Sequence, residues 1–384
     1  MSPPPDAIPP HLRPHLKLAL VPGLGPKRTR ALLDHFGSAD AVLLATAAQL
    51  QQVPLIGADL AAQFAAAFKS VDETAEWELL KKHGVSVALP GEAAYPERLA
   101  AIDSAPPLLY YRGAWLPTDA NAVGIVGSRS CTTYGLKMAE RIAADLAKAG
   151  WCVVSGLARG IDGAAHKGAL RAGGRTIAVL AGGLSRIYPP EHEGLADEVA
   201  GQGALLTETH LMGEPERGLF PARNRFISGL SRGVVVIEAN ARSGALITAT
   251  HAAEQGREVF ALPGNADSAA SAGCLELIRK GARLVRSADD ILEDLRGIAP
   301  PDAPKRIAPP EKRPTLFDPP AATEPPPGLN DLQRRIWDAL TEPKHADVLS
   351  RELGIPVHEL TGVLTKMEMR KALRRLPGNT FERR

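Results

Sequence analysis

Four short apolar runs constrain the fold of this chain more than any other feature. They cover residues 123–126, 152–154, 177–180 and 234–237. Each is rich in Val, Ile or Leu and leads into a turn or loop that carries glycine, most of them with arginine or serine. Uninterrupted apolar runs are typical of parallel strands whose two faces are both covered by helices. Because sheets of this kind bind ligands beyond the carboxyl ends of their strands, the turns predict a phosphate-binding surface there.

Composition limits the protein classes that need to be considered. The chain has 384 residues and a net charge of +2, so a nucleic-acid site must be a local basic patch. Three widely separated cysteines form neither a zinc-binding spacing nor a disulfide framework. No stretch approaches the roughly 18 apolar residues that a membrane span requires. We therefore expect a cytoplasmic protein without membrane contact, metal or cofactor.

The sequence divides into four segments. Residues 1–85 are helical after a proline-rich start, and an apolar-Pro-x-x-Gly pattern occurs twice, near residues 20–27 and 53–58. This repeat resembles a SAM-like helix-hairpin-helix domain, and either weak DNA contact or a plain helical bundle fits it. Residues 86–297 alternate strands and helices, as in a Rossmann-like domain, with 95–113 packed on the sheet as an adjunct. The eleven prolines in residues 298–327 predict an extended linker.

The last segment, residues 328–384, returns to helical periodicity and ends near a Pro-Gly-Asn turn at 377–379. Three short helices and a terminal hairpin fit a winged-helix-like domain. Residues 366–384 carry seven Lys and Arg against two Glu, which fits contact with the backbone of double-stranded DNA. A protein-interaction module with a solvated basic tail is the alternative. The predicted third helix opens with residues poorly suited to reading base edges, so we favour a module that does not read DNA sequence.

The first two turns have the chemistry of anion contacts. In Gly127-Ser128-Arg129 the glycine admits a close backbone, and serine and arginine can donate to an oxyanion. The turn lacks the three glycines of a dinucleotide fingerprint, so a nicotinamide cofactor is not expected. The alternative is an arginine tied to a core carboxylate. In the second turn, a catalytic triad of Ser155, Asp162 and His166 is disfavoured, because helix capping and packing explain these residues more simply.

The strongest local signal is an arginine-rich segment before the fourth apolar run. Four arginines, including Arg232, fall within the sixteen residues 217–232. Guanidinium groups suit the phosphates of a polymer, and Phe220 could stack on a base. The alternative is a charged loop that Glu214 and Glu216 partly neutralise. The position beside the binding edge of the sheet favours the nucleic-acid interpretation.

Together these segments resemble the DNA-processing protein A (DprA, or Smf) family. The matching pieces are residues 125–129, 154–162, 165–170, 176–180, 188–189, 220–225 and 242–249, in the order of the family. The resemblance implies a Rossmann-like domain that binds single-stranded DNA without catalysis and forms a homodimer. It also implies a recombination mediator that protects incoming DNA and loads the RecA recombinase during natural transformation in competent cells.

The resemblance also implies which residues contact DNA. They are Gly127, Ser128, Arg129, Ser155, Gly156, Arg159, Gly160, Arg217, Phe220, Arg223, Asn224, Arg225, Ser243 and Gly244. Three positions depart from the family pattern: Pro190 and His192 replace a lysine and an asparagine, and Leu275 replaces an asparagine.

Two other functions fit parts of the sequence. A nucleotide-binding enzyme resembling the LOG-type phosphoribohydrolases would use a Gly-Gly-x-Gly-Thr loop and a glutamate, but the corresponding stretch 242–250 contains no acid. A sequence-specific repressor would need base-reading residues in its C-terminal module. The sequence therefore favours a DNA-binding protein that is not an enzyme.

Overall fold

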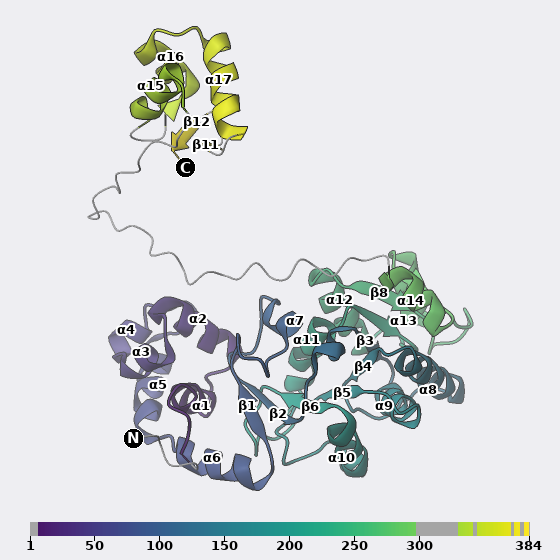
Figure 1. The fold of residues 1–384 in the computed structure, drawn as a ribbon. Helices are drawn as coiled ribbons and strands as arrows, with labels where there is room; N and C mark the ends of the chain where they lie inside the picture. Colours follow the sequence, from purple (N-terminus) through teal and green to yellow (C-terminus); the bar gives the residue numbers. More distant parts are fainter. Residues whose placement is uncertain (1–6, 297–328, 341–343, 370–371, 377–379, 384) are drawn as a thin grey trace. The chain divides into compact units, whose positions relative to one another are not determined.

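The computed structural model describes residues 7–296, 329–340, 344–369, 372–376 and 380–383 (Figure 1). The chain divides into two compact units, Met1–Arg306 and Ile307–Arg384. The stretch 298–327, which the sequence predicts to be a linker, and the turn at 377–379 lie outside the described residues. Within the described ranges, every helix is too short or too polar to cross a membrane.

Residues 13–82 form helices around two similar turns, which confirms the predicted helix-hairpin-helix repeat. Gly25 and Gly57 are the N-caps of the two helices that follow the turns. The Arg28 side chain ties the turns together, since it donates to the carbonyls of Gly23 at 2.8 Å and Leu55 at 3.3 Å. The helices are α1 (Arg13–Ala19), α2 (Pro26–Phe36), α3 (Ala39–Leu44), α4 (Ala47–Leu50), α5 (Ala58–Ser70) and α6 (Glu73–Lys82).

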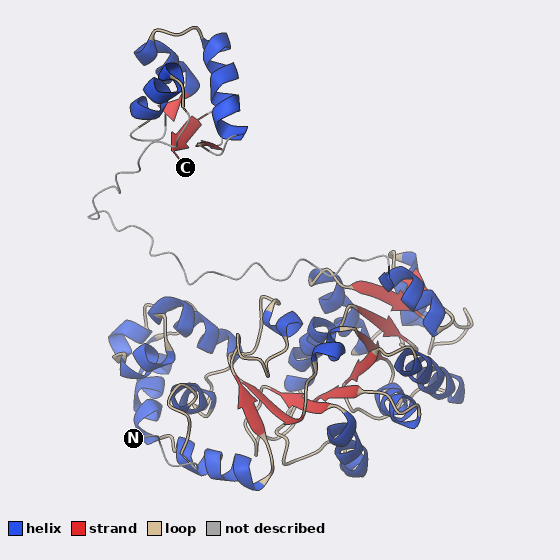
Figure 2. Ribbon diagram, viewed as in Figure 1, coloured by secondary structure: helices blue, strands red, loops and turns tan. Residues whose placement is uncertain are grey.

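A sheet, drawn with red strands in Figure 2, follows. It has nine strands in the order β1-β2-β6-β5-β4-β3-β7-β8-β9. From β6 to β9 neighbouring strands are parallel, which confirms the α/β class predicted from the apolar runs. The strands are β1 (Ser86–Ala88), β2 (Leu109–Gly113), β3 (Ala122–Val126), β4 (Cys152–Ser155), β5 (Thr176–Val179), β6 (Ala204–Thr207), β7 (Gly233–Val236), β8 (Glu258–Ala261) and β9 (Arg283–Leu284).

The segment expected to pack on the sheet as an adjunct instead extends it. Strand β2 pairs antiparallel with β6, and β1 pairs antiparallel with β2. They lie at one end of the sheet, β1 as the edge strand and β2 next to it, where a short strand can add to the ladder without the long apolar run of a central strand. The sequence signal was therefore weaker for these two strands.

Helices cover both faces of the sheet. In β3 the side chains alternate, so that Val123 and Ile125 face one layer and Ala122 and Val126 the other. One layer contains α7 (Glu97–Ala100), α11 (Leu219–Leu230), α12 (Ala245–Glu254) and α13 (Ala272–Arg279). The other contains α8 (Thr133–Lys148), α9 (Ile161–Arg171), α10 (Glu193–Gln202) and α14 (Ala288–Arg296).

The second unit has the arrangement of a winged helix. Its core surrounds Trp337, which is 2% exposed, and Leu364, which is fully buried. A three-stranded antiparallel sheet in the order β10-β12-β11 packs with its helices. The elements are α15 (Asp331–Ala339), β10 (Lys344–His345), α16 (Ala346–Leu353), α17 (Val357–Met369), β11 (Leu373–Leu376) and β12 (Thr380–Arg383).

Candidate nucleic-acid interface

The strand order of the sheet reverses at β3. Strands β4, β5 and β6 follow on one side of it, and β7, β8 and β9 lie on the other. A crevice at the carboxyl ends of such strands is the usual ligand site of an open α/β sheet. The predicted turns after β3 and β4 both lie at this edge.

Glycines pack these two turns tightly against each other. A Cβ atom on Gly127 would lie 2.5 Å from the Ile161 side chain, and one on Gly160 would lie 2.4 Å from the Ser128 carbonyl oxygen. Gly160 also has a φ of 74°, which L side chains rarely adopt. These glycines therefore hold the loops together, whereas the sequence had suggested that they give a ligand close access to the backbone.

Aromatic and guanidinium groups from three loops and from the start of α11 meet above the turns. The Arg129 guanidinium lies 4.7 Å from the centre of the Phe220 ring. Phe220 meets Tyr188 edge to face at 5.9 Å, and the Arg159 guanidinium lies 5.8 Å from the Tyr188 ring. We call these four residues, Arg129, Arg159, Tyr188 and Phe220, the strand-end platform. Tyr188 was not among the predicted site residues, although its Tyr-Pro pair after the third apolar run was a usable signal.

Arg223 lies beneath the platform and is only 5% exposed. It donates to the Gly156 carbonyl at 3.1 Å, and a Cβ at Gly156 would collide with its guanidinium. Burial lowers the pKa of Arg223 to about 10, while the nearby Asp162 carboxylate raises it. Burial raises the pKa of the Asp162 carboxyl group, and the Arg223 charge and hydrogen bonds from the backbone amides of Ala158 and Gly156 oppose that rise. An internal carboxylate therefore occupies the amides that the sequence had offered to a phosphate.

A small space of about 10 Å³ separates Arg223 from the platform and is lined by Gly156, Tyr188 and Phe220 among others. This is about the volume that one water molecule requires. The space does not admit a nucleotide, so a ligand must lie on top of the platform.

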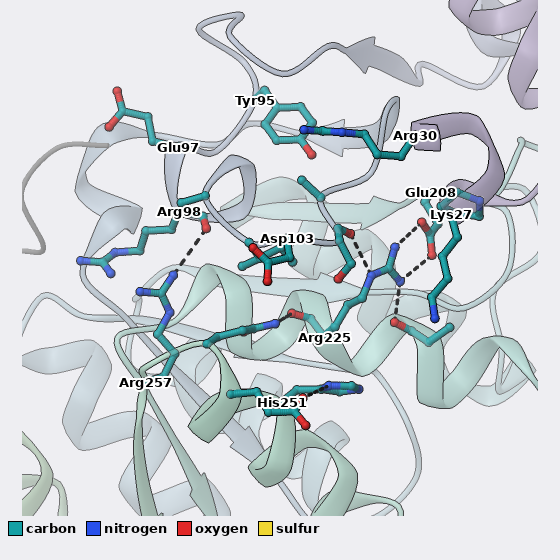
Figure 3. A pocket seen from close by; sticks show the side chains of 18 of the residues that line it. Lys27, Arg30, Tyr95, Glu97, Arg98, Asp103, Glu208, Arg225, His251 and Arg257 are labelled. Atoms are coloured by element: carbon teal, nitrogen blue, oxygen red, sulfur yellow. Dashed lines mark hydrogen bonds and ion pairs between the residues drawn. The ribbon is translucent and has the colours of Figure 1, made fainter. Parts of the chain in front are cut away.

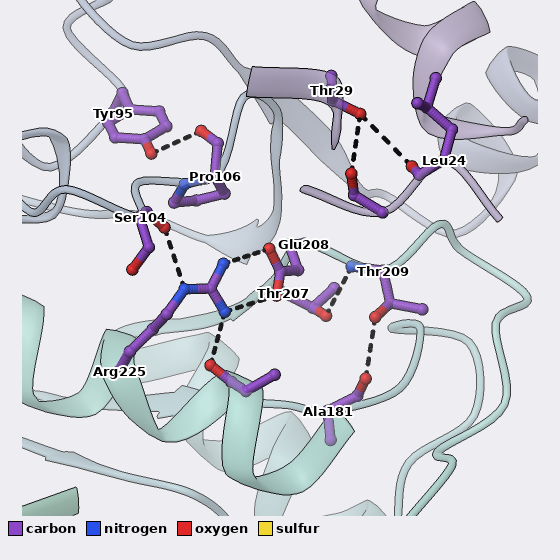
Figure 4. A network of polar contacts seen from close by, with 12 residues as sticks. Leu24, Thr29, Tyr95, Ser104, Pro106, Ala181, Thr207, Glu208, Thr209 and Arg225 are labelled. Atoms are coloured by element: carbon purple, nitrogen blue, oxygen red, sulfur yellow. Dashed lines mark hydrogen bonds and ion pairs between the residues drawn. The ribbon is translucent and has the colours of Figure 1, made fainter. Parts of the chain in front are cut away.

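Arg225 does not join this group. It makes a two-pronged ion pair with Glu208, with N–O distances of 2.8 and 2.6 Å, and it also donates to the Ser104 carbonyl (Figure 4). The reason is helical geometry: residues 219–230 form α11 and are not a loop, so side chains two positions apart point in roughly opposite directions. Arg225 is 8% exposed, and we leave it out of the interface.

The remaining predicted residues divide into internal and exposed groups. The Ser155 hydroxyl is fully buried and donates to the Ile125 carbonyl at 2.6 Å. Ser128 and Ser243 accept bonds from amides two residues further along their own turns. Asn224 donates to the Gly244 carbonyl at 3.2 Å, which joins α11 to the loop after β7. Arg217 is exposed in the turn before α11.

The disfavoured catalytic triad is not assembled. His166 is fully buried, and its Nδ1 lies 2.7 Å from the Thr176 hydroxyl, which itself donates to the Val153 carbonyl. Burial lowers the pKa of His166 to about 3, so the ring is neutral at ordinary pH. Ser155 is bonded to a carbonyl instead of to this ring.

A second internal carboxylate lies where many α/β proteins hold a nucleotide phosphate. Glu238, which follows β7, accepts from the Thr132 amide at 2.8 Å and from the Thr132 hydroxyl at 2.6 Å. Thr132 is the N-cap of α8, so Glu238 fills the positive end of that helix. The carboxylates of Glu238 and Asp162 therefore occupy two positions where α/β proteins commonly bind an anion.

The fold defines a Rossmann-like α/β protein flanked by helix-hairpin-helix and winged-helix modules. The chain belongs to the DNA recombination-mediator protein A family, whose model matches residues 86–296. Models of the DprA winged helix domain and of a SAM-like helix-hairpin-helix tandem match residues 320–379 and 16–70.

Individual relatives agree with this assignment. The Smf protein of Synechocystis is 35% identical over 95% of this chain and 96% of its own length. DprA of Bacillus subtilis is 42% identical over 56% of this chain and 73% of its own. The solved structure of Streptococcus pneumoniae DprA has a TM-score of 0.65 at 34% identity and covers 73% of this chain and 97% of that one. A Helicobacter pylori DprA structure, described for its single-stranded DNA binding mode, has a TM-score of 0.50 at 30% identity and covers 55% and 95%.

Proposed function

We propose that the strand-end platform binds single-stranded DNA and leaves its bonds intact. The observation that supports this most is the meeting of Arg129, Phe220, Tyr188 and Arg159 at the carboxyl ends of three neighbouring strands. Aromatic faces accept any unpaired base, and each stacked base contributes about 1–3 kcal/mol. Guanidinium groups beside them can hold the intervening phosphates.

The exposed ion pair in the platform is compatible with DNA binding. Arg159 contacts Glu191 at 2.5 and 3.0 Å, and both side chains are about half exposed. Ion pairs at such exposure contribute little to stability, so a phosphate can replace Glu191 at small cost. Arg129 has no carboxylate partner among the described residues and is available to DNA directly.

In the cell, we propose a recombination mediator that acts in the cytoplasm as a homodimer. It would protect incoming single strands during natural transformation and pass them to RecA. Membership of the family supports this role, as does the single-strand binding described for the Helicobacter relative.

The platform is tested by replacing Arg129 and Phe220 separately with alanine. We expect Arg129→Ala to weaken single-strand binding and to reduce the slope of log affinity against log salt by about 0.7, the value for one lost phosphate contact. Phe220→Ala should weaken binding with little change in slope, because stacking releases no counterions. Titration at two or more salt concentrations, with Arg141→Ala on α8 as an exposed control, separates these effects. Wild-type affinity in both platform variants would refute the proposal.

The competing enzyme hypothesis makes a different prediction. A phosphoribohydrolase must hold a nucleoside monophosphate, yet Glu238 and Asp162 already fill the anion sites beside α8 and the β4 turn. We propose that the protein is not an enzyme, and we expect incubation with AMP to release no adenine. Sustained release of adenine would instead favour the phosphoribohydrolase over the DNA-binding protein.

A further inference from the structure

A large cleft lies beside α11, on the side of the helix that carries Arg225 (Figure 3). Its volume is about 1770 Å³, and its walls come from the turn before α2, from α7 and its flanking loops, and from α11 and α12. Ala222 and Arg225 of α11 line the cleft, whereas Phe220 and Arg223 line the space under the platform. The cleft is thus a separate surface that shares one helix with the platform.

Three arginines from different elements gather in this cleft: Arg98 of α7, Arg232 before β7 and Arg257 before β8. Within the part of the chain that the structure describes, the side-chain partners of these arginines are all neutral. Arg98 donates to the Ala120 carbonyl at 3.1 Å, and Arg257 lies 3.4 Å from the Gly229 carbonyl and 3.5 Å from that of Arg98. The Arg232 guanidinium lies 5.8 Å from the Trp151 ring. We call these three residues the arginine cluster.

The cluster lacks the compensation that grouped charges usually have. No ion pair to a carboxylate is present for any of the three within the described ranges, and the buried Nε atoms of Arg232 and Arg257 have no partner. Burial, followed by the charges of Arg257 and Arg232, lowers the pKa of Arg98 to about 10. Partly buried like charges oppose folding, and an anion placed among them would relieve both their repulsion and their desolvation.

A second positive group lies across the cleft. Lys27 is exposed in the first turn of α2, and Figure 3 shows it on the side of the cleft opposite Arg98 and Arg257. Between these two ends, Arg225 is neutralised by Glu208. In all, seven Lys and Arg line the cleft against four acidic residues, of which Glu97, Asp103 and Glu254 are exposed.

The size of the cleft selects the class of ligand. Small-molecule sites usually enclose about 300–1,000 Å³, so this space exceeds what one nucleotide requires. Positive groups at its two ends, separated by a neutralised middle, match repeated phosphates along an extended chain better than a single anion.

We propose that this cleft binds a second stretch of nucleic-acid phosphodiester backbone, with the arginine cluster holding phosphate at one end and Lys27 at the other. This goes beyond the proposed function, because the residues involved are distinct from the platform. The backbone could belong to the same single strand where it passes around α11 or to a separate duplex. The experiment below distinguishes these two sources.

The test uses the full chain with Arg232→Gln and Arg257→Gln combined, and Arg141→Gln on α8 as the matched control. Binding is measured for a single strand of about 8 nucleotides, for a single strand about four times longer, and for a duplex of that longer length. We expect the double variant to bind the short strand normally. On the long strand or on the duplex it should bind about tenfold or more weakly, with a salt slope smaller by about 0.7 or 0.9 for each lost contact. Weaker binding of the long single strand would show that the cleft holds a continuation of the same strand. Weaker binding of the duplex would show that the cleft holds a separate duplex.

Thermal unfolding separates ligand binding from a structural role. Because the substitutions remove repulsion, the double variant should unfold at the same or a higher temperature than the wild type. Added inorganic phosphate should stabilise the wild type more than the double variant. Unchanged binding to both long ligands, or a lower unfolding temperature with unchanged binding, would overturn the proposal. If the cleft variant binds DNA more weakly while Arg129→Ala binds normally, the platform is refuted as a DNA site and the cleft is supported.

Discussion

At the scale of single residues, the arginines of α11 have different tasks. Arg223 supports the Gly156 turn beneath the platform, and Arg225 joins Glu208 to the Ser104 carbonyl. Both belong to a motif whose chemistry suggested phosphate binding. Their burial and partners indicate instead that they fix the positions of the loops around the site.

Arg225→Ala should therefore destabilise the fold and leave the DNA contacts of the folded protein in place. The side chains of Arg225 and Glu208 are 9% and 12% exposed, so removal of one charge leaves the other buried and unpaired. Breaking a buried pair in this way costs about 3–5 kcal/mol. Urea unfolding measures the loss, and salt titration of the folded variant should give the wild-type slope.

The double variant Arg225→Met with Glu208→Met provides the control for this prediction. It removes both charges and should recover most of the lost stability. A variant Arg225→Ala that kept wild-type stability but lost salt dependence would return Arg225 to the DNA interface.

How much the sequence can predict is clearest in this helix. The four Val-rich runs identified the parallel core because strands buried on both faces need an unbroken apolar sequence. A helix over residues 219–230 was not predicted from the sequence, and a charged loop was offered only as the alternative to a nucleic-acid contact, yet these residues form α11, and Pro221 falls in the first helical turn, where proline is tolerated. The spacing of Arg223 and Arg225 could have separated their roles. The identity of Glu208 as a partner could not be predicted, since it depends on how β6 lies beside α11.

At the scale of elements, the two hairpin turns differ at one equivalent position. Gly23 has a φ of 76° in the first turn, and Leu55 has a φ of 70° in the second. Leu55 is 62% exposed and lines the cleft, so burial in a core does not account for it. The second turn thus holds a leucine in a conformation that favours glycine.

Leu55→Gly should raise the free energy of unfolding by about 0.5–1 kcal/mol. The left-handed conformation costs a residue with a Cβ about 1–2 kcal/mol, and replacement by glycine removes this cost. Glycine also gives the unfolded chain more conformational freedom, which offsets about 0.5–1 kcal/mol of the stabilisation. Chemical denaturation measures the change. Leu44→Gly is the matched control, because Leu44 is 84% exposed but lies in α3, where glycine should destabilise. Equal destabilisation in both variants would mean that the Leu55 side chain contributes packing that outweighs its strain.

At the scale of the whole molecule, the two compact units have separate cores. Every buried apolar cluster in the described part of the chain draws its members from one unit alone. The platform and the cleft both lie in the first unit, whereas the basic residues of 366–384 lie in the second. Single-strand binding and any additional duplex contact should therefore be separable by shortening the chain.

A chain that ends at Arg306 should fold with the unfolding midpoint of the first unit and bind single strands within about threefold of the full chain, because it keeps the platform. Its duplex affinity should fall, and the salt slope for duplex should decrease by about 0.9 for each phosphate that the second unit contacted. Side-by-side titrations of both chains at several salt concentrations provide the measurement. If the shortened chain folds but loses single-strand affinity, the second unit must supply contacts that the platform lacks. If its duplex affinity is unchanged, the basic residues of the winged helix do not contact the DNA backbone, and the arginine cluster of the first unit becomes the stronger candidate for duplex binding.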